Sequence, residues 1–475
     1  MVKILALVLL LLPWSLPAVA ADQAALQAAV ARSGLPVDSL SLLAVEHGRG
    51  ADRELLAVNA QAPRIPASVT KLITAAAVLR DIPFGTRFET RLLSAAPRQG
   101  ATLAGDLVLR GGGDPSLVSE TLWLLVNRLA QTGIGEIAGD ILVDDSYFDD
   151  ILLDPSRDTR RSEMAYDAPI SALSFNWNAL ALAVAPGAKP GDAATVAVEP
   201  PSDYVQIDNR ARTVAGHSID RLAAARRAGT SHPGDTLVVS GEIGVNAGTF
   251  DGYRNITRPA LWTGANFKLY LGYRGIRVAG TVRPGTAAAN SRLLARVEGR
   301  PVEQLVVDMN KVSSNFIAEM LTKNLAARRA PPGTMAGGMA VLDEYMAGLG
   351  LDAGEYHLAN PSGLTRINRL SANALVRVLD DMAGDFRVAN EFLASLPIAG
   401  IDGTLQHRMA QSPAQGWVRA KTGYIDGAVS LAGVGGRSSG ERITFAFLYN
   451  GPAPAYQVRA LFDQLSALLV EPWNR

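Results

Sequence analysis

The two ends of the chain share a pattern of secondary structure that the middle lacks, and this constrains the fold more than any other feature. Residues 39–46 and 54–58 have the pattern of strands, and an Ala- and Leu-rich helix is predicted at 72–80. Residues 429–449 contain two alternating runs typical of neighbouring antiparallel strands. The pattern between these ends, at about 96–284, is different. We therefore predict an α+β fold with helices on an antiparallel sheet, interrupted by a large insertion.

The insertion is predicted to have two parts. Residues 190–262 are rich in Val, Thr, Gly and Asp and contain short alternating runs, which indicates a small β-rich module. Because inserted domains usually begin and end close together on a surface, we expect residues 96–284 to fold as a separate substructure whose removal spares the folding of the rest. The predicted division is a discontinuous main domain at 21–95 and 285–475, an inserted domain at 96–189 and 263–284, and the nested module at 190–262.

The first twenty residues form a separate unit with the pattern of a secretory signal peptide. Lys3 gives it a positive start, residues 4–12 are an unbroken apolar run, and Ala18-Val19-Ala20 is a small-x-small cleavage site before Ala21. The apolar run is too short for a spanning helix, although a retained membrane anchor is the alternative. We expect cleavage near Ala20/Ala21 and a periplasmic protein with no integral membrane segment after processing.

Composition excludes several classes of function. The chain has 45 basic and 45 acidic residues, and removing residues 1–20 takes away only Lys3, so no charge argument favours nucleic acid. It has no Cys, which excludes disulfides and thiolate chemistry, and its five His have no metal-binding spacing. The acidic pairs Asp144-Asp145 and Asp149-Asp150 are interpreted as solvated turn residues, with metal ligands as the alternative. We predict neither a metal nor a cofactor.

One short stretch, Pro66–Leu72, places a serine three residues before a lysine. Residues three apart lie on one face of a helix, so the Ser68 hydroxyl and the Lys71 amine are expected to point the same way. A serine is a weak nucleophile until a base takes its proton, and a lysine kept neutral by burial or nearby positive charge can be that base. The alternative is a surface serine beside a solvated lysine, and this short pattern alone does not decide between them.

Two further short patterns follow in the chain. Lys421-Thr422-Gly423 follows directly on a predicted strand at 416–420. A Ser-x-Asn pattern occurs three times, at 174–176, 313–315 and 371–373. Ser313 and Asn315 stand where a polar stretch meets an apolar predicted helix, so they can project from a loop into a cleft, whereas Ser371 has the position of a helix N-cap.

Ser-x-x-Lys, Ser-x-Asn and Lys-Thr-Gly, in this order, resemble the signature of the penicillin-recognising serine acyltransferases. The chain is similar to the D-Ala-D-Ala carboxypeptidase/endopeptidase type of penicillin-binding protein (class C, low molecular mass, penicillin-binding protein 4-like), which carries a large insertion between the first two motifs. The stretches that carry the resemblance are 66–72, 111–117, 168–178, 309–321, 362–368, 396–405 and 419–433.

The resemblance implies an acyl-enzyme formed on Ser68 from D-Ala-D-Ala bonds of peptidoglycan peptides, and covalent inhibition by β-lactam antibiotics. We expect a chain without residues 96–284 to keep its reaction with penicillin. The implied catalytic residues are the nucleophile Ser68, the base Lys71 and the proton relay Ser313. The implied substrate-binding residues are Asn315, Lys421, Thr422 and Tyr424, the last through its backbone N–H, which would form an oxyanion hole with that of Ser68. The resemblance implies no metal and no cofactor.

Two other functions share some of these features. A β-lactamase-like hydrolase has the same motifs but does not need so large an insertion, and a non-catalytic cell-wall binding protein would not need all three motifs intact. The sequence also departs from the family pattern. Asn360-Pro361 replaces the usual Asp-Gly, Tyr424 replaces a small residue, and Arg160-Arg161 stand near the place of an acidic residue that reads the substrate side chain in some relatives. Side-chain specificity, the balance of carboxypeptidase and endopeptidase activity, and the oligomeric state are therefore left open.

Overall fold

The computed structural model describes residues 18–48, 50–157, 162–219, 221–229 and 234–471. Most of the predicted signal peptide therefore lies outside the described residues, and helix α1 (Ala18–Arg32) begins just before the predicted cleavage site. In the described part of the chain, no helix combines the length and the apolar character needed to cross a membrane.

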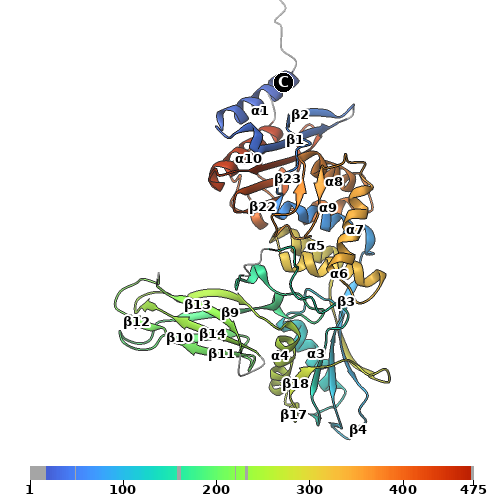
Figure 1. Cartoon of the computed structure of the whole chain (residues 1–475), viewed down its shortest axis with the longest axis vertical. Coiled ribbons are helices and arrows are strands. Elements are labelled where there is room, and N and C mark those ends of the chain that lie inside the picture. The colour runs from blue at the N-terminus through green and yellow to red at the C-terminus, as the bar shows by residue number, and fades with distance from the viewer. Residues whose placement is uncertain (1–17, 49, 158–161, 220, 230–233, 472–475) are drawn as a thin grey trace, which may run out of the picture.

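Strands from both ends of the chain form one antiparallel sheet. Its spatial order is β2 (Arg53–Val58), β1 (Leu40–His47), β24 (Arg442–Asn450), β23 (Ala428–Gly436) and β22 (Val418–Ile425). β1 pairs with β24 without interruption, from Leu40 opposite Tyr449 to His47 opposite Arg442. Figure 1 shows the blue N-terminal strands beside the red C-terminal strands near one end of the molecule. The predicted α+β core with an antiparallel sheet is confirmed.

Helices cover both faces of this sheet. On one face, Leu461 of α10 (Ala455–Val470) packs in a cluster with Leu26 of α1 and Leu42 of β1. On the other face, Leu43 of β1 joins a cluster formed with several further helices, because successive strand residues point to opposite sides. These helices are α2 (Lys71–Asp81), α5 (Val302–Lys311), α6 (Asn315–Arg329), α7 (Met335–Ala347), α8 (Ala372–Gly384) and α9 (Ala389–Ser395).

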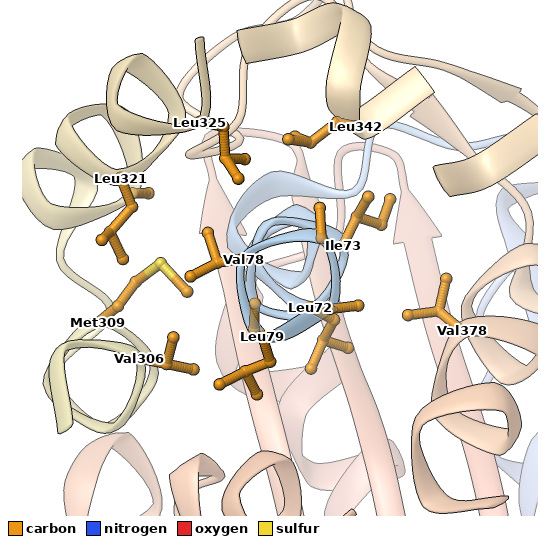
Figure 2. Close-up of a cluster of buried hydrophobic side chains, with 14 of the residues drawn as sticks. Leu72, Ile73, Val78, Leu79, Val306, Met309, Leu321, Leu325, Leu342 and Val378 are labelled. Carbon is orange, nitrogen blue, oxygen red and sulfur yellow. The ribbon is translucent and has the colours of Figure 1, made fainter. Parts of the chain in front are cut away.

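Helix α2 lies at the centre of the second cluster (Figure 2). Residues 71–79 are all buried, as expected of a helix in the interior, and most of them are apolar. In Figure 2 the side chains around it come from α5, α6, α7 and α8, and those labelled are Val306, Met309, Leu321, Leu325, Leu342 and Val378. Full burial of one such side chain stabilises a fold by about 1.5–3 kcal/mol, so this packing fixes the position of the N-terminal end of α2.

The insertion contains a second five-stranded sheet. Its order is β18 (Val282–Pro284), β8 (Ile141–Asp144), β6 (Leu107–Gly111), β3 (Arg87–Ser94) and β19 (Arg292–Pro301). The predicted main domain included residues 87–94 and 292–301, but these strands pair with each other, and β3 also pairs with β6. We therefore place the two boundaries of the insertion near residues 86 and 302, and the division into domains stays our proposal.

The remaining strands of the insertion form smaller sheets. One has the order β17 (Arg277–Val278), β7 (Glu136–Ile137), β5 (Thr102–Leu103) and β4 (Arg98–Gln99), and helices α3 (Ser119–Gln131) and α4 (Pro259–Tyr273) accompany it. The β-rich module, which projects to the left in Figure 1, contains β9 (Ala179–Ala185), β10 (Thr195–Glu199), β11 (Val205–Asn209), β12 (Arg212–Val214), β13 (Ala223–Ala228), β14 (Asp235–Ser240), β15 (Glu242–Gly244) and β16 (Phe250–Asn255). We include β9 in this module because it pairs with both β10 and β16. The module then begins before residue 190, the start predicted from the sequence.

Buried polar contacts join the insertion to the core. Lys323 of α6 is 1% exposed, forms an ion pair with Asp149, and donates to the carbonyl oxygen of Ile151 at 2.7 Å. Asn324 Nδ2, also on α6, donates to the carbonyl oxygen of Gly113 at 2.8 Å. Because the core buries these groups against the insertion, the two parts depend on each other.

Asp144 and Asp145 of the insertion have protein partners. Asp144 is 2% exposed and accepts from Ser146 N at 3.1 Å and from Ala287 N at 3.0 Å. Asp145 accepts from Ser171 Oγ at 2.8 Å. The expectation of a solvated carboxylate is therefore wrong for Asp144, which instead holds two backbone segments together. Among the residues that the structure describes, no cluster of three or more His, Asp or Glu is arranged to hold a metal ion.

Candidate active site

The serine and the lysine of the first motif meet at the entrance of α2. Ser68 lies in a short 3-10 helix, η2 (Ala67–Thr70), and its Oγ is 3.0 Å from Lys71 Nζ. Ala67 has a φ of 50°, a left-handed value that is rare for Ala, so the backbone is strained directly before Ser68. Strain of this kind is concentrated at functional sites. A Cβ at Gly363 would lie 2.0 Å from the Ala67 carbonyl oxygen, so only glycine fits where the loop after α7 crosses this turn.

Lys71 is fully buried, and its hydrogen-bond partners explain its chemistry. Its Nζ donates to Asn315 Oδ1 at 2.7 Å and to the Ser362 carbonyl oxygen at 2.6 Å, and both oxygens can only accept. A neutral amine has two N–H groups for them and one lone pair for the Ser68 hydroxyl. Burial, and then the positive charge of Lys421, hold the pKa of Lys71 well below its usual range.

Ser313 and Asn315 lie in the turn between α5 and α6. Ser313 has a φ of 59°, again in the left-handed region, and Ser314 caps α6 by accepting from Ile317 N at 3.2 Å. Asn315 is the first residue of α6. While its Oδ1 accepts from Lys71, its Nδ2 donates to the carbonyl oxygen of Tyr166 at 3.0 Å. Asn315 therefore connects the lysine of the first motif to the insertion.

The other two Ser-x-Asn patterns have local structural roles. Ser371 caps α8, as predicted, by accepting from Ala374 N at 2.9 Å. Ser174 Oγ donates to the carbonyl oxygen of Ser171 at 2.7 Å, within the insertion. Of the three patterns, the structure brings Ser313 and Asn315 to the Ser68 motif.

Strand β22 supplies the third motif. Lys421 is fully buried, its Nζ donates to Ser313 Oγ at 2.8 Å, and burial lowers its pKa to about 7. Thr422 Oγ1 donates to Thr404 Oγ1 at 2.8 Å. The site thus contains two hydrogen-bonded Ser–Lys pairs, Ser68 with Lys71 and Ser313 with Lys421.

Gly423 and Tyr424 bring the backbone of β22 against the turn that carries Ser68. A Cβ at Gly423 would lie 2.7 Å from the Pro66 carbonyl oxygen and 3.1 Å from Ser68 N, so the strand approaches as closely as a glycine allows. The Tyr424 side chain is 53% exposed, and its ring lies 5.0 Å from the guanidinium carbon of Arg459. The large side chain thus extends over the surface and leaves the backbone beside Ser68 unobstructed.

Sequence reasoning missed a buried network behind Lys71. Arg157, Glu319, Asn360 and Ser362 are each 5% exposed or less. Ser362 Oγ lies 3.1 Å from Glu319 Oε1 and 2.6 Å from Asn360 Oδ1. Glu319 and Ser362 fall in stretches that carry the family resemblance, which is a signal that could have found them, whereas nothing in the sequence marks Arg157.

Tyr166, which is 56% exposed, lines two pockets. One, of about 420 Å³, includes Ser313, Asn315 and Trp177 in its lining. The other, of about 480 Å³, includes Arg157 and Arg366. Both pockets are lined by residues of the insertion and of the core. Residues 160 and 161 stand near the place where some relatives have an acidic residue that reads the substrate side chain. Both residues lie outside the described part of the chain.

Comparisons with known proteins agree with the three motifs. A model of the D-Ala-D-Ala carboxypeptidase 3 (S13) family matches residues 23–470. The chain is 34% identical over 428 residues to a D-alanyl-D-alanine carboxypeptidase of Actinomadura sp. strain R39, covering 86% of this chain and 77% of that protein. Penicillin binding protein 4 of Haemophilus influenzae has a similar structure, with a TM-score of 0.77, 23% identity, and coverage of 93% of this chain and 99% of that chain. Its complex with a β-lactam gives a TM-score of 0.73 at 23% identity and the same coverage. The chain therefore belongs to the D-Ala-D-Ala carboxypeptidase (S13) family of serine peptidases.

Proposed function

We propose that the protein cleaves D-Ala-D-Ala bonds of peptidoglycan peptides through an acyl-enzyme on Ser68, as a carboxypeptidase, as an endopeptidase, or as both. The observation that carries this proposal is the 3.0 Å contact between Ser68 Oγ and the fully buried Nζ of Lys71. Burial lowers the pKa of this amine well below its usual range, which favours its basic form, and the nucleophile and its base are already in contact without substrate.

Acylation then proceeds by transfer of one proton. Ser68 Oγ attacks the carbonyl carbon of the scissile bond, and its proton passes to Lys71 Nζ. The backbone N–H groups of Ser68 and Tyr424 stabilise the oxyanion, which requires no particular side chain at position 424. When the C–N bond breaks, Ser313 relays this proton from Lys71 to the leaving amine, and the product with the new amino terminus departs. Water then hydrolyses the ester and returns Ser68 to its starting state.

Three residues hold the substrate in this proposal. Asn315 binds a substrate amide as well as orienting Lys71, to which it is hydrogen-bonded. Lys421 and Thr422 bind the terminal carboxylate, and both already contact hydroxyl groups that a carboxylate oxygen can replace. A β-lactam carries a comparable carboxylate and acylates Ser68 in the same way. No metal or cofactor takes part in these steps.

The site of action follows from the substrate. Peptidoglycan lies outside the cytoplasmic membrane, and the first twenty residues have the pattern of a secretory signal peptide. We therefore include export to the periplasm, with cleavage near Ala20/Ala21, in the proposal.

Labelling with a fluorescent penicillin tests the proposal directly. Peptide mapping should locate a stable adduct on Ser68, and Ser68→Ala should abolish it. Incubation with a pentapeptide-stem muropeptide and with a cross-linked dimer, followed by mass spectrometry, separates carboxypeptidase from endopeptidase activity. Labelling that survives Ser68→Ala, or rapid turnover of penicillin in place of a stable adduct, would contradict the assignment.

A further inference from the structure

A buried arginine and a buried glutamate lie behind Lys71. Glu319 is on α6 of the core, with a side chain that is 0% exposed, and Arg157 is in a loop of the insertion, with a side chain that is 2% exposed. Arg157 Nε donates to Glu319 Oε1 at 2.7 Å, and its Nη1 donates to Asp167 Oδ1 at 2.7 Å. A charge buried this deeply is tolerated only when it is paired. The core glutamate therefore relies on an arginine that the insertion supplies.

A single residue connects this pair to the base of the reaction. Ser362 Oγ lies 3.1 Å from Glu319 Oε1 and 2.6 Å from Asn360 Oδ1, two acceptors that share its one hydrogen, and the carbonyl oxygen of Ser362 accepts from Lys71 Nζ at 2.6 Å. An unpaired carboxylate at this place would favour the protonated form of Lys71. A protonated Lys71 has no lone pair for the proton of Ser68.

We propose that Arg157 is a positioning residue that keeps Lys71 available as a base by neutralising Glu319, so that the insertion controls the reactivity of the core site. The inference rests on the proposed function, in which Lys71 accepts the proton of Ser68. It gives the insertion a chemical role in addition to any contact with the polymer.

The other charges near Lys71 determine the sign of the expected effects. Lys421 from β22 and Arg157 lower the pKa of Lys71, whereas Glu319 from α6 raises it. Farther out, Asp167 is a second partner of Arg157, and Asp154 accepts from Asn360 Nδ2 at 2.6 Å. Loss of Arg157 should therefore raise the pKa of Lys71, and loss of Glu319 should lower it.

The test is the rate of acylation of the full-length protein by a fluorescent penicillin, measured as a function of pH. The acid limb of this profile is the pH range over which the rate falls as Lys71 is protonated. In Arg157→Met this limb should move to higher pH by about one unit, so that acylation at a pH below the limb is about tenfold slower than in the wild type. Arg157→Lys keeps the charge and should stay near the wild-type profile. Arg387→Met is a matched control, because this arginine also pairs with a carboxylate, Asp385, but has a side chain that is 82% exposed.

A second substitution separates tuning of the base from a merely structural role. Adding Glu319→Gln to Arg157→Met removes both charges and should return the acid limb to the wild-type position or below it. Glu319→Gln alone should move the limb to lower pH, and it provides the test even if Arg157→Met yields no folded protein. A purely structural role would reduce the rate without these opposite shifts.

The outcomes distinguish this inference from the proposed function. An acid limb of Arg157→Met that coincides with the wild-type limb overturns the inference, and so does a Glu319→Gln limb that stays in place or moves to higher pH. If the wild-type protein is not labelled on Ser68 at all, the proposed function itself has failed.

Discussion

Removing the insertion tests how far the core depends on it. The perturbation is deletion of residues 96–284, with residue 95 joined to residue 285 by a short Gly/Ser linker. From the sequence we expected the remaining core to fold and to react with penicillin. The structure predicts the opposite, because the core residues Glu319 and Lys323 are 0% and 1% exposed and pair with Arg157 and Asp149 of the deleted segment.

The expected loss of stability can be worked out from these two pairs. Removing the partner of a charge that stays buried typically costs about 3–5 kcal/mol, so about 6–10 kcal/mol is the upper bound for the two pairs, reached when water does not solvate the two side chains left in the core. The whole stability of a typical domain is about 5–15 kcal/mol. The deletion also removes β6, the central neighbour of β3, and leaves Asn324 Nδ2 without its acceptor at Gly113. We therefore expect little or no folded product.

The assay is the yield of soluble protein, followed by penicillin labelling of Ser68 and by denaturant unfolding. A matched variant carries the same deletion together with Glu319→Gln and Lys323→Met, which removes both unpaired charges. It should give more folded protein than the plain deletion. A plain deletion variant that is soluble and labels as fast as the full chain would refute the reasoning.

Two further predictions concern single residues. Lys421→Ala removes a positive charge that lowers the pKa of Lys71, so the acid limb of penicillin acylation should move to higher pH by about one to two units. Lys421→Arg keeps the charge and should leave this limb near the wild-type position. Identical limbs for wild type and Lys421→Ala would show that Lys421 does not tune the base. Asn360→Asp places a new carboxylate against those of Asp154 and Glu319, which raises the pKa of the new group above its value in the unfolded chain. We therefore expect the free energy of unfolding to fall by about 3 kcal/mol near pH 8, and by less as the pH falls and the new carboxylate is protonated. Denaturant unfolding at pH 5 and pH 8 measures this difference, and a loss that is equal at both pH values would contradict the placement of these carboxylates.

Local patterns in the sequence were sufficient for the core. The alternating runs near both termini predicted the strands that became β1, β23 and β24, and the Ala- and Leu-rich run after Ser68 predicted α2. The order of the three short motifs led to the family, and the structure brings Ser68 into contact with Lys71 and Ser313 into contact with Lys421. These features depend on residues close together in the chain or on a resemblance, which is why they could be predicted.

The boundaries of the insertion depend on long-range pairing, and from that pairing we propose boundaries other than those we predicted from the sequence. The run at 87–94 has the pattern of a strand, but an alternating pattern does not state which sheet it joins. It pairs with residues 292–301, about two hundred positions later, as well as with β6. The ion pair between Arg157 and Glu319 was missed for the same reason, since a lone arginine in a loop carries no periodicity that points to its partner.

The four lysines with described partners in the core show how the fold separates chemistry from structure. Lys323 and Lys311 each form an ion pair with an aspartate, Asp149 and Asp402 respectively, as a buried or half-buried ammonium group requires. Lys71 and Lys421 are fully buried but, within the described residues, contact only hydroxyl, amide and carbonyl oxygens. Such partners satisfy the N–H groups without stabilising the charge, so burial lowers the pKa of both amines. A carboxylate does lie behind Lys71, and an arginine is already paired with it. The two lysines to which we assign proton exchange and anion binding therefore have no carboxylate partner among the described contacts, whereas Lys311 and Lys323 each have one.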